Sequence, residues 1–239
     1  MSQKAWLAFC VAIFLPIVGY LIADKFSKDA VHMPRRYYYD TVITKMQKGK
    51  ETTDTVWHKV NNITLYNQLG SQVSLDDLNG RIIVADFFFT HCPSICPALT
   101  RNMKLLQESL QLKHGRMRVD TPFVQFLSFT VDPERDSVTA LKKYADRYGV
   151  NHDTWWMLTG PKKVIYDQSI NEFKLGLQDD EDGIVDTAFI HTNKFVLLDK
   201  ERVVRGYYNG LDSNEIHRLS EDIVFLMLEK DKKKKRKIF

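Results

Sequence analysis

Apolar runs of strand length alternate along most of the chain with stretches in which apolar residues recur at helical spacing. Ile82–Phe89 and Phe123–Val131 are rich in β-branched and aromatic residues, as buried strands are. Shorter strands are predicted within a hairpin at Ile63–Leu75 and at Trp155–Leu158, Phe195–Leu198 and Val203–Tyr207. Helices are predicted from Pro97 to Leu110 and at Val138–Tyr148, Pro161–Phe173 and Asn214–Glu229. This alternation predicts an α/β domain with a central mixed sheet flanked by helices.

The segment before this domain has a different character. Trp6–Ala23 contains 18 residues without a charge, about 27 Å of helix, which is close to the thickness of a bilayer core. We therefore predict one transmembrane anchor at 6–23 after a short tail at 1–5. Leu21 does not fit the small-residue pattern of a cleavage site, which argues against a cleaved signal peptide. Residues 24–55 are polar and are predicted to form a stalk with one short helix, and the globular domain is predicted at 56–229.

Composition supports a folded domain and limits its partners. Apolar residues make up 44% of the chain and charged residues 27%, which is enough for a full core. The net charge of +4 is uneven, because Lys230–Lys237 contains seven basic residues and one acidic residue. We expect residues 230–239 to be a solvated, disordered tail. Basic charge confined to such a tail argues against nucleic-acid binding.

Two of the three cysteines lie together between the predicted central strand and its helix. Cys92 and Cys96 are four residues apart at a helix start, so both sulfurs can lie on one face. The partial positive charge of a helix N-terminus lowers a thiol pKa and favours the thiolate, which binds metals and attacks disulfides. Cys10 lies in the apolar run and is interpreted as a small hydrophobic residue. The pair therefore indicates either a soft-metal site or a redox dithiol.

Other polar residues could complete such a site. His91 adjoins Cys92 and is either a group that tunes its thiolate or an exposed loop histidine. Asp132, Arg135 and Asp136 form a charged turn after the second buried strand, which either frames the site or a partner surface, or serves as a helix cap and local ion pair. His191 precedes the last predicted hairpin. Taken alone, such a histidine is more often a half-buried polar group than a ligand.

Three motifs resemble the SCO/SenC family of copper chaperones for cytochrome c oxidase assembly. They are FTHCPSICP at Phe89–Pro97, SFTVDPERD at Ser128–Asp136, and the pair His191–Thr192 just before a strand. The resemblance covers about Trp57–Glu229, with the motifs in the family's order. A Cys-x-x-x-Cys-Pro element combined with a distant histidine is more specific than either part alone.

The resemblance implies a thioredoxin-like fold on a single membrane anchor, with copper held by Cys92, Cys96 and His191. Thiolates select Cu(I), and an imidazole also allows Cu(II) to be held. The implied function is delivery of copper to the Cu-A site of an oxidase subunit, with other copper chaperones or thiol–disulfide exchange proteins as further partners. The alternative is a thiol–disulfide reductase in which Cys92 and Cys96 are the reacting pair and keep partner cysteines reduced.

The expected location is a bacterial cytoplasmic membrane, with the domain facing the periplasm. No Arg- and Ser-rich transit peptide precedes the apolar run, which favours a bacterium over a mitochondrion. Basic residues are more frequent after the run than before it, so the positive-inside rule does not support this orientation. The orientation therefore rests on the resemblance.

Overall fold

The computed structural model describes residue 6 and residues 12–21, 33–47, 50–112, 123–175 and 192–229. The chain divides into two compact units, Met1–Met33 and Pro34–Phe239. In the first unit, residues 6 and 12–21 are helical, and the rest of the predicted anchor lies outside the described residues. Among the helices that the structure describes, none combines the length and the hydrophobicity that crossing a membrane requires.

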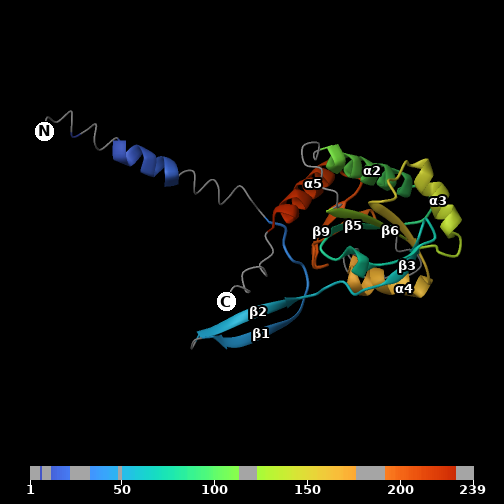
Figure 1. Ribbon diagram of the computed structural model, residues 1–239, viewed down its shortest axis with the longest axis horizontal. Coiled ribbons are helices and arrows are strands. Elements are labelled where there is room, and N and C mark those ends of the chain that lie inside the picture. The colour runs from blue at the N-terminus through green and yellow to red at the C-terminus, as the bar shows by residue number, and fades with distance from the viewer. Residues whose placement is uncertain are drawn as a thin grey trace. The chain divides into compact units, whose positions relative to one another are not determined.

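The second unit is built on a seven-stranded sheet with the strand order β4-β3-β7-β6-β5-β8-β9. Figure 1 shows this sheet between helices α2 and α4. The three central strands β5, β6 and β7 are parallel, and the strands on both sides of them are antiparallel to their neighbours. The strands are β3 (Thr64–Asn67), β4 (Gln72–Ser74), β5 (Ile82–Phe88), β6 (Val124–Thr130), β7 (Trp155–Thr159), β8 (Lys194–Leu198) and β9 (Val204–Asn209). The predicted mixed sheet is therefore confirmed.

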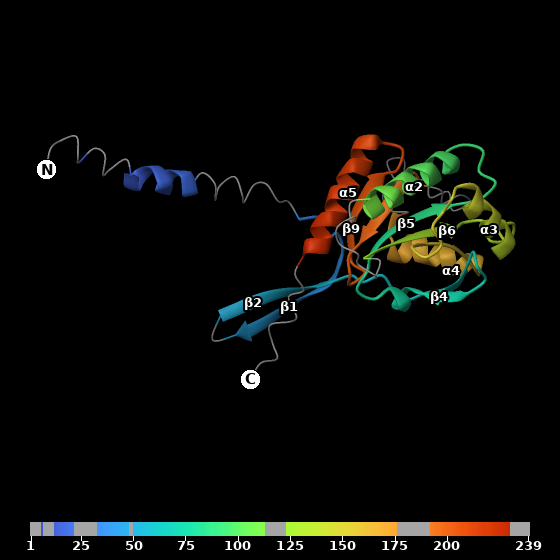
Figure 2. The ribbon, with the colours of Figure 1, turned by 45° about the horizontal axis from the view of Figure 1, so that its top comes forward.

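Helices cover both faces of the sheet (Figure 2). They are η1 (Leu75–Leu78), α2 (Cys96–Leu112), α3 (Val138–Arg147), α4 (Lys162–Asp167), the π-helical turn η2 (Gln168–Glu172) that continues α4, and α5 (Ser213–Leu228). Helices α2, α3 and α5 contribute apolar side chains to one core cluster, and α4 and η1 contribute to the other. Every helix and strand predicted between residues 63 and 229 has a counterpart in the structure.

Strand β5 is one of the three parallel central strands, and it contributes to both core clusters. Ile82, Val84 and Phe88 pack in the cluster under α2, α3 and α5, whereas the alternate residues between them pack in the cluster on the α4 side. All seven residues of β5 are buried, as expected for a parallel strand covered on both faces. The end of β5 therefore lies between two packed layers, and the loop that follows it starts from a fixed point.

The predicted stalk differs from expectation. In place of a short helix, strands β1 (Tyr39–Gln47) and β2 (Lys50–Trp57) form an antiparallel hairpin that is a separate two-stranded sheet. The prediction of a helix there is wrong for the described residues of this segment. Both strands are rich in threonine and other β-branched residues, which favour extended backbone even where few of them are buried.

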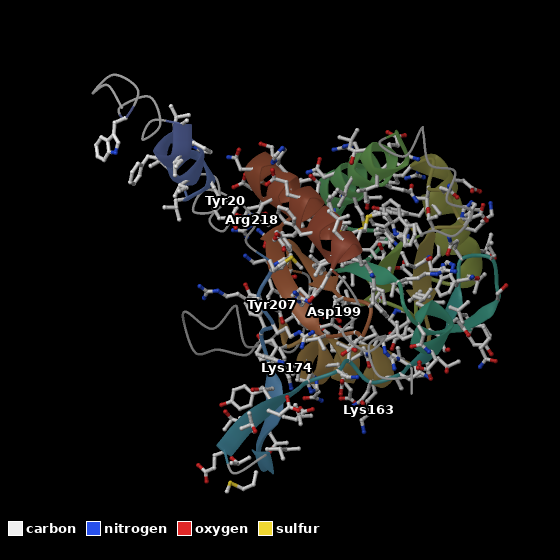
Figure 3. The ribbon with its side chains drawn as sticks, turned by 60° about the vertical axis from the view of Figure 1, so that its left-hand side comes forward. Tyr20, Lys163, Lys174, Asp199, Tyr207 and Arg218 are labelled. Atoms are coloured by element: carbon white, nitrogen blue, oxygen red, sulfur yellow. The ribbon has the colours of Figure 1, made fainter. Side chains whose placement is uncertain are left out.

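The residues before the hairpin are attached to the main sheet through Arg205 of β9. Its guanidinium group donates to the backbone carbonyl of Pro34 at 2.8 Å and pairs with the carboxylates of Asp199 and Glu229, each at 2.9 Å. Asp199 is labelled in Figure 3. The Arg205 side chain is only 3% exposed. One buried cation thus joins the first and the last described segments of this unit.

Candidate metal or redox site

The two cysteines lie in the loop between β5 and α2 and at the first residue of that helix. Cys96 begins α2, and the N–H groups of the next turn donate to the carbonyl of Ile95 at 3.0 Å. The Thr100 hydroxyl donates to the Cys96 carbonyl at 2.9 Å. Both cysteines are free thiols, and they are 6% and 1% exposed, respectively. The predicted placement of the pair in the loop that leads into a helix is confirmed, with Cys96 as the first helical residue and Cys92 before it.

The surroundings of the two sulfurs make them unequal, and the Cys92 sulfur lies 3.6 Å from the Ser94 hydroxyl oxygen. Burial raises the pKa of Cys92, but hydrogen bonds from the side chains and backbone N–H groups of Cys96 and Ser94 outweigh it and bring that pKa to about 7. Burial, and then the neighbouring Cys92, raise the pKa of Cys96 to about 12. Near neutral pH, Cys92 is therefore partly thiolate and Cys96 is a thiol.

A buried carboxyl group that sequence reasoning missed lies under the pair. Asp86 of β5 is 1% exposed, and its register places it on the face of the sheet that α2 covers. Within the described part of the chain, its Oδ1 atom has no hydrogen-bond partner. Burial raises the pKa of Asp86 to about 7, partly offset by a hydrogen bond with Ser128, and its charge contributes to the raised pKa of Cys96. A charged residue inside an otherwise apolar strand is the signal that could have revealed it.

A second buried aspartate fastens the start of the loop. Asp136 is fully buried, and its carboxylate accepts from the Thr90 N–H at 3.0 Å, the Thr90 hydroxyl at 2.5 Å and the Thr130 hydroxyl at 2.5 Å. Thr90 is two residues before Cys92. The turn after β6 is therefore bonded to the loop after β5, and this contact fixes the backbone that leads to the first sulfur.

Of the other predicted site residues, His91 lies beside the cysteine pair, whereas Asp132 and Arg135 pair with each other. His91 is beside the pair, with its side chain 60% exposed and its Nδ1 atom 2.9 Å from the Thr90 hydroxyl oxygen. Arg135 forms a local ion pair with Asp132, and its side chain is 62% exposed. Of the charged turn, only Asp136 reaches the cysteine loop through contacts that the structure records. Asp132 and Arg135 match the simpler interpretation of a local ion pair.

The predicted third ligand cannot be located. His191 lies outside the described residues, as do residues 176–190 before it. Among the residues that are described, no group of three or more His, Cys, Asp or Glu side chains is arranged to hold a metal ion. The described part of the site is therefore a pair of soft sulfur donors with a buried carboxyl below it and an exposed imidazole beside it.

A mixed sheet with an asymmetric, buried cysteine pair at the start of the helix after its central strand defines a thioredoxin-like dithiol protein. The sequence model of the SCO1/SenC family matches residues 52–227, so the chain belongs to that family. The SCO1 protein homolog of Bacillus subtilis is 32% identical over 176 residues, which cover 73% of this chain and 86% of the homolog.

Solved structures agree with this assignment. BsSco, described as a member of the Sco family of cytochrome c oxidase assembly proteins with a disulfide switch, is 32% identical with a TM-score of 0.60, over 73% of this chain and 96% of that one. Yeast Sco1, solved with copper bound, is 22% identical with a TM-score of 0.56, over 74% and 98% of the two chains. At that identity, the yeast protein supports the fold alone. The α/β thioredoxin-like fold of Sco proteins is thereby confirmed.

Proposed function

We propose that this protein binds copper through Cys92, Cys96 and His191 and delivers it to the Cu-A site of a cytochrome c oxidase subunit. The observation that carries the proposal is the buried thiol pair at the start of α2, with one sulfur that is partly ionised near neutral pH. Thiolates are soft ligands and favour Cu(I) over hard cations. Family membership and the description of BsSco as an oxidase assembly protein support the same role.

His191 would supply the third ligand. Two thiolates leave a Cu(I) ion open to competing thiols, whereas an added imidazole raises affinity and also permits Cu(II). A site with three protein ligands can still accept a ligand from the partner, so copper can pass by stepwise exchange of sulfurs. The pair must be reduced for loading, because sulfurs joined in a disulfide no longer act as thiolate ligands.

An anaerobic titration tests the copper proposal. The full chain, reduced and held in detergent micelles, is titrated with Cu(I) against a competing chelator. We expect one tightly bound equivalent, which Cys92→Ser abolishes and His191→Ala weakens by at least about tenfold. The control is His217→Ala, an exposed histidine on α5 that pairs with Glu221. No retention by the wild-type chain would overturn the proposal, and affinity indifferent to His191 would remove that ligand from it.

The unequal thiols favour a second candidate function, a thiol–disulfide reductase. The Cys92 thiolate would attack a disulfide of the partner and form a mixed disulfide while one partner sulfur leaves as a thiol. Cys96 would then displace the second sulfur, leaving the Cys92–Cys96 pair oxidised and the partner reduced. In His191→Ala, reduction of a model disulfide should continue at the wild-type rate while copper affinity falls. Reduction that depends on His191 would contradict this division of roles.

The proposed setting is a bacterial cytoplasmic membrane, with residues 6–23 as a single-pass anchor and residues 56–229 facing the periplasm. The uncharged apolar run at 6–23 supports the anchor. The oxidase subunit that carries Cu-A would be the receiving partner, and other copper chaperones or thiol–disulfide exchange proteins would load copper or reduce the pair. Labelling of engineered cysteines from the outside of intact cells would test the orientation.

A further inference from the structure

A continuous set of hydrogen bonds runs from the protein interior to the imidazole beside Cys92. The buried Asp136 carboxylate accepts from the Thr90 hydroxyl at 2.5 Å, and the oxygen of that hydroxyl lies 2.9 Å from Nδ1 of His91. The His91 ring is also 3.7 Å from Asp136, measured from Nδ1 to Oδ1. The inner end of this chain is fully buried and the outer end is 60% exposed.

These bonds determine which nitrogen of a neutral His91 carries the proton. The Thr90 hydroxyl has one proton and donates it to Asp136. Its oxygen can therefore only accept from His91, which requires the proton of the imidazole to be on Nδ1. The Nε2 atom is then left with its lone pair, on a side chain that is 60% exposed. Histidines that bind metals are commonly oriented in this way, with the other ring nitrogen donating to a carboxylate or another acceptor.

The thiols themselves present little surface to an arriving ion. Cys92 is 6% exposed and Cys96 is 1% exposed. A copper ion carried by another molecule would meet an exposed donor before it met either sulfur. His91 is adjacent in sequence to Cys92, and imidazole is a good ligand for copper in either oxidation state.

We propose that His91 is a capture ligand, whose Nε2 atom binds incoming copper at the surface before the buried thiols receive it, and that Asp136 and Thr90 orient it. This inference rests on the proposed copper-binding function. The step is a ligand exchange without electron transfer: one bond from Cu(I) to the donor molecule breaks and the bond to Nε2 forms. The sulfurs then replace Nε2 and whatever ligand of the donor remains, and each sulfur that is still a thiol releases its proton to water. If Asp136 and Thr90 served only to hold the loop in place, the two Thr90–Asp136 hydrogen bonds would be enough. The contact between Thr90 and His91 would then have no role.

The first test reads the tautomer without any metal. In the reduced full chain in micelles, long-range ¹H–¹⁵N spectra show which ring nitrogen is protonated, and the His91 signals are identified by their loss in His91→Ala. We expect the Nδ1–H form in the wild type and in Thr90→Ser, which keeps the hydroxyl. In Thr90→Val we expect a shift toward the Nε2–H form that unconstrained histidine favours. An Nε2–H form in the wild type would overturn the orienting role.

The second test reads the kinetics of capture. Full-length reduced protein is mixed with a Cu(I)–chelator complex, and the rate of uptake and the final affinity are both measured. We expect uptake to slow by about tenfold in His91→Ala, with little change in final affinity. The matched control is His217→Ala, whose side chain is 74% exposed on α5 and which should load at the wild-type rate.

The outcomes separate the two proposals. Equal uptake rates in the wild type and His91→Ala would overturn the capture role and leave the copper proposal intact. Equal losses of rate and affinity would make His91 a ligand of the final site, which would also overturn its capture role. Failure of the wild-type chain to bind Cu(I) would overturn the proposed function and the capture role together, whereas the tautomer would still report whether Asp136 and Thr90 orient the ring.

Discussion

Two buried aspartates flank the cysteine loop, and they differ in how their oxygens are satisfied. Asp136 accepts three hydrogen bonds, two of them from Thr90 at the start of the loop. Asp86, in the strand under the loop, leaves Oδ1 without a partner in the described structure. A carboxylate with good donors stabilises the fold and fixes its neighbours, whereas one without them is destabilising when charged. The first therefore organises the site and the second lowers stability beneath it.

Removal of Asp136 should produce the largest effect. Asp136→Ala deletes three charge-assisted hydrogen bonds and leaves donors of the half-buried Thr90 and the buried Thr130 unpaired. We expect a loss of about 5 kcal/mol in the free energy of unfolding, measured by urea denaturation. The control is Asp132→Ala, which removes a local ion pair with the exposed Arg135 and should cost about 1 kcal/mol or less. Similar losses in the two variants would contradict the role assigned to Asp136.

Asp86→Asn should act in the opposite direction, and its effect should depend on pH. Asp86 ionises near pH 3.8 in the unfolded chain but retains its proton in the folded chain up to about pH 7. Between pH 4 and pH 7 the unfolded state therefore binds fewer protons than the folded state. The free energy of unfolding of the wild type falls as the pH rises through this range, and the loss stays constant above pH 7. We expect Asp86→Asn to be more stable than wild type by about 4 kcal/mol at pH 8 and not at pH 4.

Urea denaturation at pH 4, 6 and 8 would measure this difference. Asp153→Asn, at an exposed aspartate, is the charge-matched control and should leave the pH dependence unchanged. If the wild type and Asp86→Asn had parallel stability curves, Asp86 would not be the group that retains its proton.

The smallest expected effect concerns the thiols between these two aspartates. Alkylation of Cys92 should increase with a midpoint near pH 7, while Cys96, with its pKa of about 12, should remain unmodified at that pH. Ser94→Ala removes one of the hydrogen bonds to Cys92, so the midpoint should rise by less than about one pH unit. Mass spectrometry of each cysteine after timed alkylation would measure both. A Cys92 midpoint near pH 9 would show that burial outweighs the hydrogen bonds.

The sequence predicted the central strand, the loop with the cysteine pair and the following helix because these depend on local patterns. The run after Ile82 has the apolar continuity of a strand buried on both faces, and Pro97 is in the first turn of α2. The hairpin β1–β2 was missed because its strands have little apolar alternation to distinguish them from a polar stalk.

The contacts around the cysteine pair could not be predicted in the same way. Asp136 and Thr90 are 46 residues apart in the sequence. The charged turn could equally be a helix cap, so its sequence did not indicate which carboxylate faces the protein interior. Of the two residues that the sequence offered as the cap, Asp136 and Ser137, the structure uses Ser137, whose hydroxyl accepts from the Ala140 N–H. The strand that contains Asp86 was predicted, but the lack of a hydrogen-bond partner for its Oδ1 atom was not. That lack depends on which side chains α2 and β6 bring to the face of the sheet that α2 covers.

The bonds of Arg205 to Pro34 and Glu229 have a consequence for how the domain can be rearranged. Because both groups contact one guanidinium, the two ends of the domain meet at a single point. Domains with adjacent ends tolerate circular permutation and insertion into other proteins. A pulling force applied between the two ends would act first on β9 and on the contacts of the Arg205 guanidinium. The cysteine loop, which follows β5, would lie outside the direct path of that force.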